Sequence, residues 1–152
     1  MRFVINRRDL LLGTATIAAS RALSAQYSTA AFSGLSGRPP VAKRRFTSAA
    51  IERAIQNFRS ATGSPQLQQI FENCFPNTLD TTVFPGTDGG HPDTYVITGD
   101  IDAMWLRDSS AQMWAYLPFV KQDPELSHLI EGVVRRQARL VLLDSYANAF
   151  TR

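Results

Sequence analysis

The sequence predicts a mainly helical fold with one short β-hairpin. Four segments after residue 46 place apolar residues three and four positions apart behind a residue that can cap a helix. Two short runs of β-branched and aromatic residues flank a glycine-rich loop, which is typical of a hairpin. Apolar residues make up 44% of the 152 residues, an ordinary share for a protein with a packed core.

Residues 1–25 have the organisation of an export signal. Residues 1–8 are basic, residues 10–19 are apolar, and the small residues that follow suit cleavage. This apolar run is too short to span a bilayer, whose core requires about 20 residues. The pair Arg7-Arg8 before it is typical of a twin-arginine signal, with an ordinary secretory signal as the alternative. We therefore expect the export machinery to deliver the protein to the periplasm or the cell exterior.

Residues 26–45 are rich in Ser, Ala, Gly, Pro and basic side chains without periodicity, which predicts a flexible linker. Residues 1–45 hold eight basic side chains against one acidic, whereas residues 46–152 hold eight basic and twelve acidic ones. The sequence pI of 9.4 therefore comes from the leader and linker. The folded part offers no electrostatic case for binding nucleic acid.

Two helices are predicted between residues 47 and 76. The first begins after Thr47 or Ser48, and the second begins with Ser64 as its cap and Pro65 in its first turn. The apolar faces of the two helices comprise Ile51, Ala54, Ile55 and Phe58 in the first and Leu67, Ile70, Phe71 and Cys74 in the second. Cys74 is the single cysteine, and its place on an apolar face predicts a buried, inert thiol rather than a nucleophile.

A hairpin and a third helix are predicted next. Residues 81–84 and 95–98 favour short strands on either side of the loop 86–92. His91 in this loop has no metal-ligating neighbour in the sequence, so we expect a solvated side chain, with contact to a ligand as the alternative. The helix is expected to start at Ser109 with a capping box and to end before Pro118. Its apolar face comprises Met113, Trp114 and Leu117.

The last predicted helix is the clearest. Asp123 caps it, Pro124 occupies its first turn and Glu125 complements the helix dipole. Its apolar stripe comprises Leu126, Leu129, Ile130, Val133, Val134, Leu140 and Val141. The arginines away from this stripe, Arg135, Arg136 and Arg139, are expected to form a solvated face. Residues 144–152 resemble the start of further structure, so we expect residues 46–152 to be a fragment of a larger domain.

The stretch 94–116 carries the candidate chemistry. Asp100 and Asp102 would lie about 6.5–7 Å apart on one face of an extended segment. They approach a substrate from the same side, whereas the acid and base of an inverting glycosidase act from opposite sides, so we expect a role in sugar binding, with a catalytic pair as the alternative. Trp105, Arg107 and Asp108 instead supply a stacking face, a donor fork and acceptors for sugar hydroxyls. The alternative is structural: Arg107 and Asp108 pair with backbone or each other, and Trp105 belongs to the core.

Three segments together resemble a known family: FENCFPNTLDTTV from Phe71, TYVITGDIDAMWLRDSSAQ from Thr94 and DSYANAF from Asp144. They are similar to the N-terminal part of the metal-independent exo-α-1,6-mannosidases, glycoside hydrolase family 125, over residues 46–152. The resemblance implies the N-terminal portion of an (α/α)6 toroid, incomplete in this chain. It implies removal of terminal mannose from a mannose-containing glycan with inversion, without a metal or organic cofactor.

The resemblance also implies a set of substrate-binding residues. They are Asp100, Trp105, Arg107, Asp108, Tyr146 and Asn148. The family's catalytic Asp and Glu come from later in the domain and have no counterpart before Arg152, so no catalytic residue is assigned. Two hypotheses follow: part of an exo-mannosidase, or a non-catalytic carbohydrate-binding or interaction module derived from one.

Overall fold

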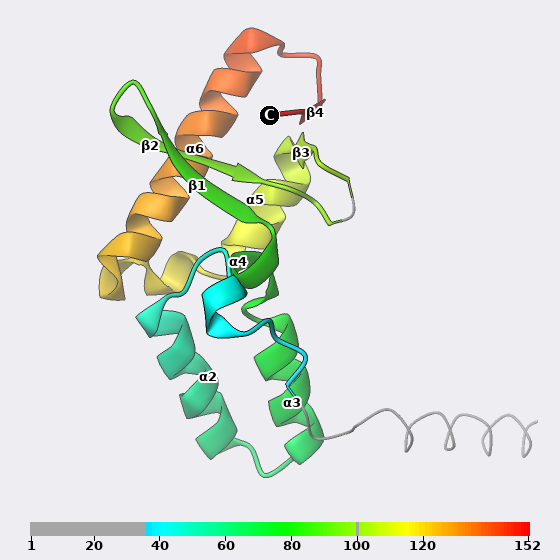
Figure 1. Cartoon of the computed structure of the whole chain (residues 1–152), viewed down its shortest axis with the longest axis vertical. Helices are drawn as coiled ribbons and strands as arrows, with labels where there is room; N and C mark the ends of the chain where they lie inside the picture. Colours follow the sequence, from blue (N-terminus) through cyan, green and yellow to red (C-terminus); the bar gives the residue numbers. More distant parts are fainter. Residues whose placement is uncertain (1–35, 100) are drawn as a thin grey trace, which may run out of the picture. The chain divides into compact units, whose positions relative to one another are not determined.

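A computed structural model describes residues 36–99 and 101–152 of the chain (Figure 1). This part is mainly helical with a small antiparallel hairpin, as predicted. The predicted export signal, the first half of the predicted linker and Asp100 lie outside the described residues, so export stays a prediction. No helix in the described part combines the length and apolar content that crossing a membrane requires.

The described part contains two small two-stranded sheets among helices. In chain order its elements are η1 (Val41–Lys43), α2 (Ala49–Ala61), α3 (Pro65–Cys74), α4 (Asn77–Thr81), β1 (Val83–Asp88), β2 (His91–Val96), β3 (Met104–Trp105), α5 (Leu106–Trp114), η2 (Leu117–Gln122), α6 (Pro124–Leu143) and β4 (Ala149–Phe150). In Figure 1 the β1–β2 hairpin crosses α6, and the short strands β3 and β4 meet near the end of α6.

The helices α2 and α3 begin as predicted. The Ser48 hydroxyl accepts a hydrogen bond from the Ile51 amide at 3.3 Å, and the Ser64 hydroxyl accepts one from the Leu67 amide at 3.4 Å. Each hydroxyl satisfies an amide that has no partner within its own helix. The apolar face of α2 buries Ile51 and Ile55.

The burial predicted for α3 is wrong for three of its four apolar residues. Leu67, Ile70 and Cys74 are exposed, because within the described residues no element covers their side of the helix. Phe71, the fourth residue of the predicted face, is half-buried and stacks on Phe58 of α2 with ring centroids 4.1 Å apart. Of these four residues, Phe71 alone therefore packs against the core.

The hairpin is confirmed, but its strands are longer than predicted and its loop is shorter. Gly89 and Gly90 adopt positive φ angles of 56° and 80°, which makes a two-residue turn. The residues on either side of this turn pair instead of forming a loop, from Asp88 with His91 to Val83 with Val96. Thr81, predicted to start the first strand, ends α4 instead, and His91 is exposed at the start of β2.

Helix α6 begins at its predicted cap, and most of its predicted stripe is buried. Val134 and Val141 are exposed, because they lie on the side of the helix that faces away from the hairpin. The solvated face predicted for the arginines is also wrong in part. Arg136 is half-buried and donates to the buried Asp93 of β2 at 3.0 Å, and Arg139 contacts the same carboxylate at 3.2 Å.

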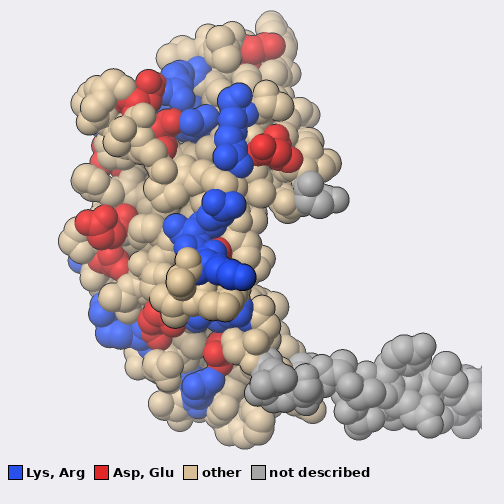
Figure 2. Space-filling view, viewed as in Figure 1, with Lys and Arg blue, Asp and Glu red and all other residues tan. Residues whose placement is uncertain are grey.

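These ion pairs tie the hairpin to α6. Figure 2 shows basic and acidic side chains interspersed over the visible face rather than gathered into a patch of one sign. Arg136 also lies over the ring of Tyr95, 5.2 Å from its centroid, in a cation–π contact. The arginine run of α6 is therefore part of the packing between helix and hairpin.

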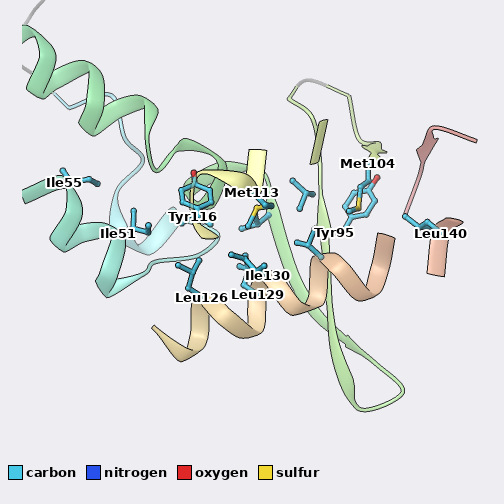
Figure 3. Close-up of a cluster of buried hydrophobic side chains, with 14 residues drawn as sticks. Ile51, Ile55, Tyr95, Met104, Met113, Tyr116, Leu126, Leu129, Ile130 and Leu140 are labelled. Carbon is cyan, nitrogen blue, oxygen red and sulfur yellow. The ribbon is translucent and has the colours of Figure 1, made fainter. Parts of the chain in front are cut away.

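One core joins the hairpin to α2, α5 and α6 (Figure 3). Figure 3 shows Met104 beside the Tyr95 ring, and Met113 near the residues that α6 contributes. The fully buried members with the largest side chains include Tyr95, Tyr116, Ile51, Leu79, Met104 and Leu126. Of the predicted apolar face of α5, Met113 is buried as expected, but Trp114 and Leu117 are exposed.

Residues 36–45 differ from the predicted flexible linker. The Arg38 guanidinium is 5% exposed and donates to Asp80 at 2.7 Å and to Glu52 at 2.6 Å. These hydrogen bonds from Arg38 outweigh the effect of burial and lower the pKa of Glu52. The Arg45 amide also donates to the Asp80 carbonyl at 2.9 Å. The predicted linker therefore does not extend over residues 36–45.

Asp123 caps two helices at once. Its carboxylate accepts from the Leu126 amide of α6 at 3.2 Å and from the Ser48 hydroxyl at 2.5 Å, beside the start of α2. We expect Asp123→Ala to lower the free energy of unfolding by about 2 kcal/mol, the upper range for a lost cap. Urea unfolding at neutral pH measures this, with Asp123→Asn as the comparison, because asparagine keeps one acceptor oxygen and can therefore cap one of the two helices. Equal losses in both variants would contradict the dual cap.

The stabilisation from Asp123 should depend on pH. Burial alone would raise the pKa of this carboxyl, but hydrogen bonds from Ser48 and from backbone amides outweigh burial and hold its pKa below the usual 3.8. Such a group stabilises the fold fully above pH 3.8, and the contribution is lost as the pH falls through the lower value of the folded state. The difference in melting temperature between wild type and Asp123→Asn should therefore shrink below pH 4. A constant difference down to pH 3 would contradict this.

Candidate functional site

A cleft of about 410 Å³ opens between two segments that are some forty residues apart in the chain. The first segment joins β3 to the first turn of α5, and the second is the loop between α6 and β4. The residues lining the cleft are Trp105, Leu106, Arg107, Asp108, Ser145, Tyr146, Ala147 and Asn148. Stacking, charged and amide side chains thus face one space.

The first wall is helical where a loop was predicted. Helix α5 begins at Leu106, three residues before the predicted start at Ser109, with Trp105 as its N-cap. The predicted capping box is wrong because the Ser109 hydroxyl is turned back into the helix, where it donates to the Trp105 carbonyl at 2.6 Å. Arg107 and Asp108 therefore lie on the first turn of a helix, which fixes their backbone.

The second wall is a short loop shaped by Asp144. Its carboxylate accepts hydrogen bonds from the amides of Tyr146 at 2.9 Å and Ala147 at 3.2 Å, an Asx-turn that reverses the chain after α6. Tyr146 is 98% exposed, so its ring is open to a ligand. Asn148 is exposed beside it and brings an amide side chain to the same wall.

The two walls are joined by backbone and side-chain contacts. Strands β3 and β4 pair antiparallel, with Trp105 opposite Ala149. The Leu106 amide donates to the Asn148 carbonyl at 3.1 Å, which extends the pairing into the cleft. Behind the strands, the buried Tyr95 donates its hydroxyl to the Phe150 carbonyl at 3.1 Å. The spacing between the walls is therefore set by the fold.

Five of the six predicted substrate-binding residues line this cleft. They are Trp105, Arg107, Asp108, Tyr146 and Asn148. The sixth, Asp100, lies outside the described residues. Asp102, which was not assigned to the site, is exposed and pairs with Arg152 at 3.2 Å. The cleft also uses Leu106, Ser145 and Ala147, which the sequence did not single out because small and apolar side chains carry no chemical signal of their own.

Arg107 and Asp108 do not pair with each other or with the backbone of the described residues, as the structural alternative would require. Within the described residues, neither Arg107 nor Asp108 forms an ion pair or a side-chain hydrogen bond. Trp105 is half-buried and lines the cleft. A donor fork, an acceptor pair and an aromatic surface are thus available to a ligand in one place.

The cleft is better equipped for binding than for hydrolysis. Among the residues that line it in the described part of the chain, Asp108 is the one carboxylate. Inverting glycosidases need two carboxyl groups about 6.5–9.5 Å apart on opposite sides of the scissile bond. Asp108 alone cannot meet that requirement. No cluster of three or more His, Cys, Asp or Glu side chains suited to a metal ion occurs among the described residues.

Comparison with known proteins identifies relatives over most of this part of the chain. The family model described as metal-independent α-mannosidase (GH125) matches residues 64–152. The meiotically up-regulated gene 157 protein of Schizosaccharomyces pombe is 43% identical over 114 residues, which cover 74% of this chain and 22% of that protein. A Streptococcus pneumoniae structure, from a family of metal-independent α-mannosidases and in a non-productive complex with α-1,6-mannobiose, is 42% identical with a TM-score of 0.63.

That structural match covers 70% of this chain and 25% of the Streptococcus pneumoniae chain. It confirms the predicted fold class, a helical part of the family's α/α toroid with a small hairpin. The chain thus spans about a quarter or less of the length of these two relatives.

Proposed function

Because this chain belongs to the GH125 family of metal-independent α-mannosidases, we propose that it forms a wall of the mannose-binding pocket of a glycoside hydrolase. The proposed reaction is release of terminal mannose from α-1,6-linked mannosides with inversion. The observation that carries the proposal is the cleft, in which residues from two distant segments present six polar or aromatic side chains to one space.

Four side chains of the cleft suit the binding of a hexose. The Arg107 guanidinium donates two parallel hydrogen bonds to neighbouring hydroxyls, and the Asp108 carboxylate accepts from them. Trp105 and Tyr146 offer rings for the apolar face of the sugar. The volume of about 410 Å³ exceeds that of one monosaccharide ring, so the cleft has room for a terminal mannose and part of the next unit.

Hydrolysis requires an acid and a base that the cleft does not hold. In the proposed mechanism, a protonated carboxyl donates to the departing oxygen while a second carboxylate activates water on the opposite face. The residues of the cleft bind and orient the sugar, and their contacts contribute to rate where they tighten in the transition state. The acid and base are assigned to parts of the family domain that have no counterpart in this sequence.

A second candidate function is a non-catalytic carbohydrate-binding module. The single carboxylate in the cleft is the observation that favours it, since one carboxylate can bind a sugar but cannot supply both proton transfers. The two candidates share the binding step. They differ in whether this chain works with further catalytic residues.

We expect the chain to bind α-1,6-mannobiose without hydrolysing it. Isothermal titration of the chain with α-1,6-mannobiose, with maltose as the control disaccharide, measures binding. Release of free mannose, followed by chromatography against a buffer blank, measures hydrolysis. Absence of binding at millimolar sugar would contradict the proposed pocket. Turnover above the blank would contradict the assignment of acid and base outside this sequence.

A further inference from the structure

We propose that Gln137 of α6 is a positioning residue for the cleft, holding the first turn of α5 in the orientation that presents Arg107 and Asp108. The role of these two side chains in sugar binding rests on the proposed function. The positioning itself rests on contacts within the fold. Gln137 does not line the cleft, so it acts through other residues.

The side-chain amide of Gln137 meets three acceptors on α5. Its Nε2 atom lies 3.1 Å from the Leu106 carbonyl, 2.8 Å from the Ser109 hydroxyl and 3.0 Å from the Ser110 hydroxyl. An amide has two N–H groups, so these acceptors share its protons. One side chain of α6 therefore donates hydrogen bonds to three groups at the start of α5.

The hydroxyls of the two serines in turn donate hydrogen bonds to backbone carbonyls. The Ser109 hydroxyl donates to the Trp105 carbonyl at 2.6 Å, and the Ser110 hydroxyl donates to the Leu106 carbonyl at 2.8 Å. The hydrogen bonds thus lead from Gln137 of α6 through Ser109 to Trp105, the N-cap residue of α5. Each hydroxyl can accept from Gln137 and donate onward, so the directions are mutually consistent.

This hydrogen-bond network fixes the residues that come before and after Arg107 and Asp108. Trp105 and Leu106 precede Arg107 and Asp108, and the two serines follow them directly. Ser109 is completely buried and Gln137 is half-buried, so water competes little for the hydrogen bond between them, whereas Ser110 is exposed. With both flanks fixed, the backbone between them has little freedom, and the two charged side chains start from a defined position.

The network also reaches the opposite wall. The Leu106 carbonyl accepts from Gln137, while the amide of the same residue donates to the Asn148 carbonyl at 3.1 Å. Leu106 therefore links α6, the first wall and the second wall. Exchange of its amide proton with solvent reports directly on whether the walls stay joined.

The variant Gln137→Met tests the proposal, because methionine has a similar shape but no donor. Gln122→Met is the matched control, since it removes the same group at an exposed position of η2. In the full chain we expect amide exchange at Leu106 and Ser110 to become about tenfold faster in Gln137→Met, the order for one lost hydrogen bond. Exchange in α2 should stay unchanged, and affinity for α-1,6-mannobiose should fall by about tenfold. The control should change neither.

Each outcome is decisive for the positioning role. Unchanged exchange at Leu106 and Ser110, or an equal acceleration in α2, overturns it, because Gln137 would then be idle or only generally stabilising. Faster local exchange with unchanged sugar affinity also overturns it. If wild type binds no mannobiose while local exchange responds as expected, positioning of the turn by Gln137 is supported and the proposed function fails.

Discussion

Arg107→Ala is expected to abolish measurable binding of α-1,6-mannobiose by the chain. The guanidinium has no partner within the described residues, so its donors are free for the sugar, and charge-assisted hydrogen bonds are about twice as strong as neutral ones. Losing two of them should weaken binding on the order of a hundredfold. Because the side chain is exposed and unpaired, the melting temperature should stay unchanged.

The control for this variant is Arg53→Ala on α2, which removes an exposed arginine far from the cleft in sequence. Arg136→Ala is unsuitable, because that side chain pairs with the buried Asp93 and its loss would disturb the fold. Asp108→Ala should weaken binding in the same way as Arg107→Ala. Titration calorimetry separates the cases, and equal affinity in Arg107→Ala and Arg53→Ala would refute the assignment of the cleft.

Gly132→Ala is expected to cause a large loss of stability for the addition of a single methyl group. A Cβ at this position of α6 would stand 2.8 Å from the Thr94 amide nitrogen and closer still to the Thr94 hydroxyl. The amide belongs to the backbone of β2, so it cannot swing aside as a flexible side chain would. We expect the helix and hairpin to move apart and the free energy of unfolding to fall by about 3 kcal/mol.

Gly63→Ala provides the matched control for this effect. No atom lies within 4 Å of a Cβ built at Gly63, and its backbone is not among the positive-φ glycines of the described residues. The same methyl group should therefore leave stability unchanged or raise it slightly. Thermal unfolding followed by circular dichroism measures both variants. Similar melting temperatures for the two would show that the contact between α6 and β2 tolerates expansion.

Helix caps were the most predictable feature of the fold. Ser48, Ser64 and Asp123 each lie just before an apolar run, and each accepts a hydrogen bond from an amide in the first turn of its helix. These interactions are local, so the sequence contains all that determines them. The hairpin was predicted for a similar reason, although its turn proved to be only Gly89 and Gly90.

Burial was harder to predict than helix position. Leu67, Cys74 and Trp114 have suitable spacing for apolar faces, yet they are exposed because no described element covers them. Spacing indicates which residues share a face, but only the tertiary arrangement decides which face is covered. The burial of Arg136 was missed for the converse reason, since its partner Asp93 is 43 residues away in the chain.

The candidate site was predicted in composition but not in geometry. Trp105, Arg107 and Asp108 were selected by their chemistry, whereas Tyr146 and Asn148 were selected by resemblance. The sequence could not show that these groups share one cleft, because β3 and β4 pair across more than forty residues. Gln137 was missed altogether, because a glutamine in a helix gives no sign of the partners it meets on another helix.

The most direct test is to map the contacts of α-1,6-mannobiose on the chain by nuclear magnetic resonance. Titration should shift the indole N–H signal of Trp105 and the backbone signals of residues 105–108 and 145–148, while the hairpin turn at Gly89 and Gly90 stays unchanged. Shifts confined to other surfaces, or none at saturating sugar, would contradict the claim that these two segments form a mannose-binding cleft.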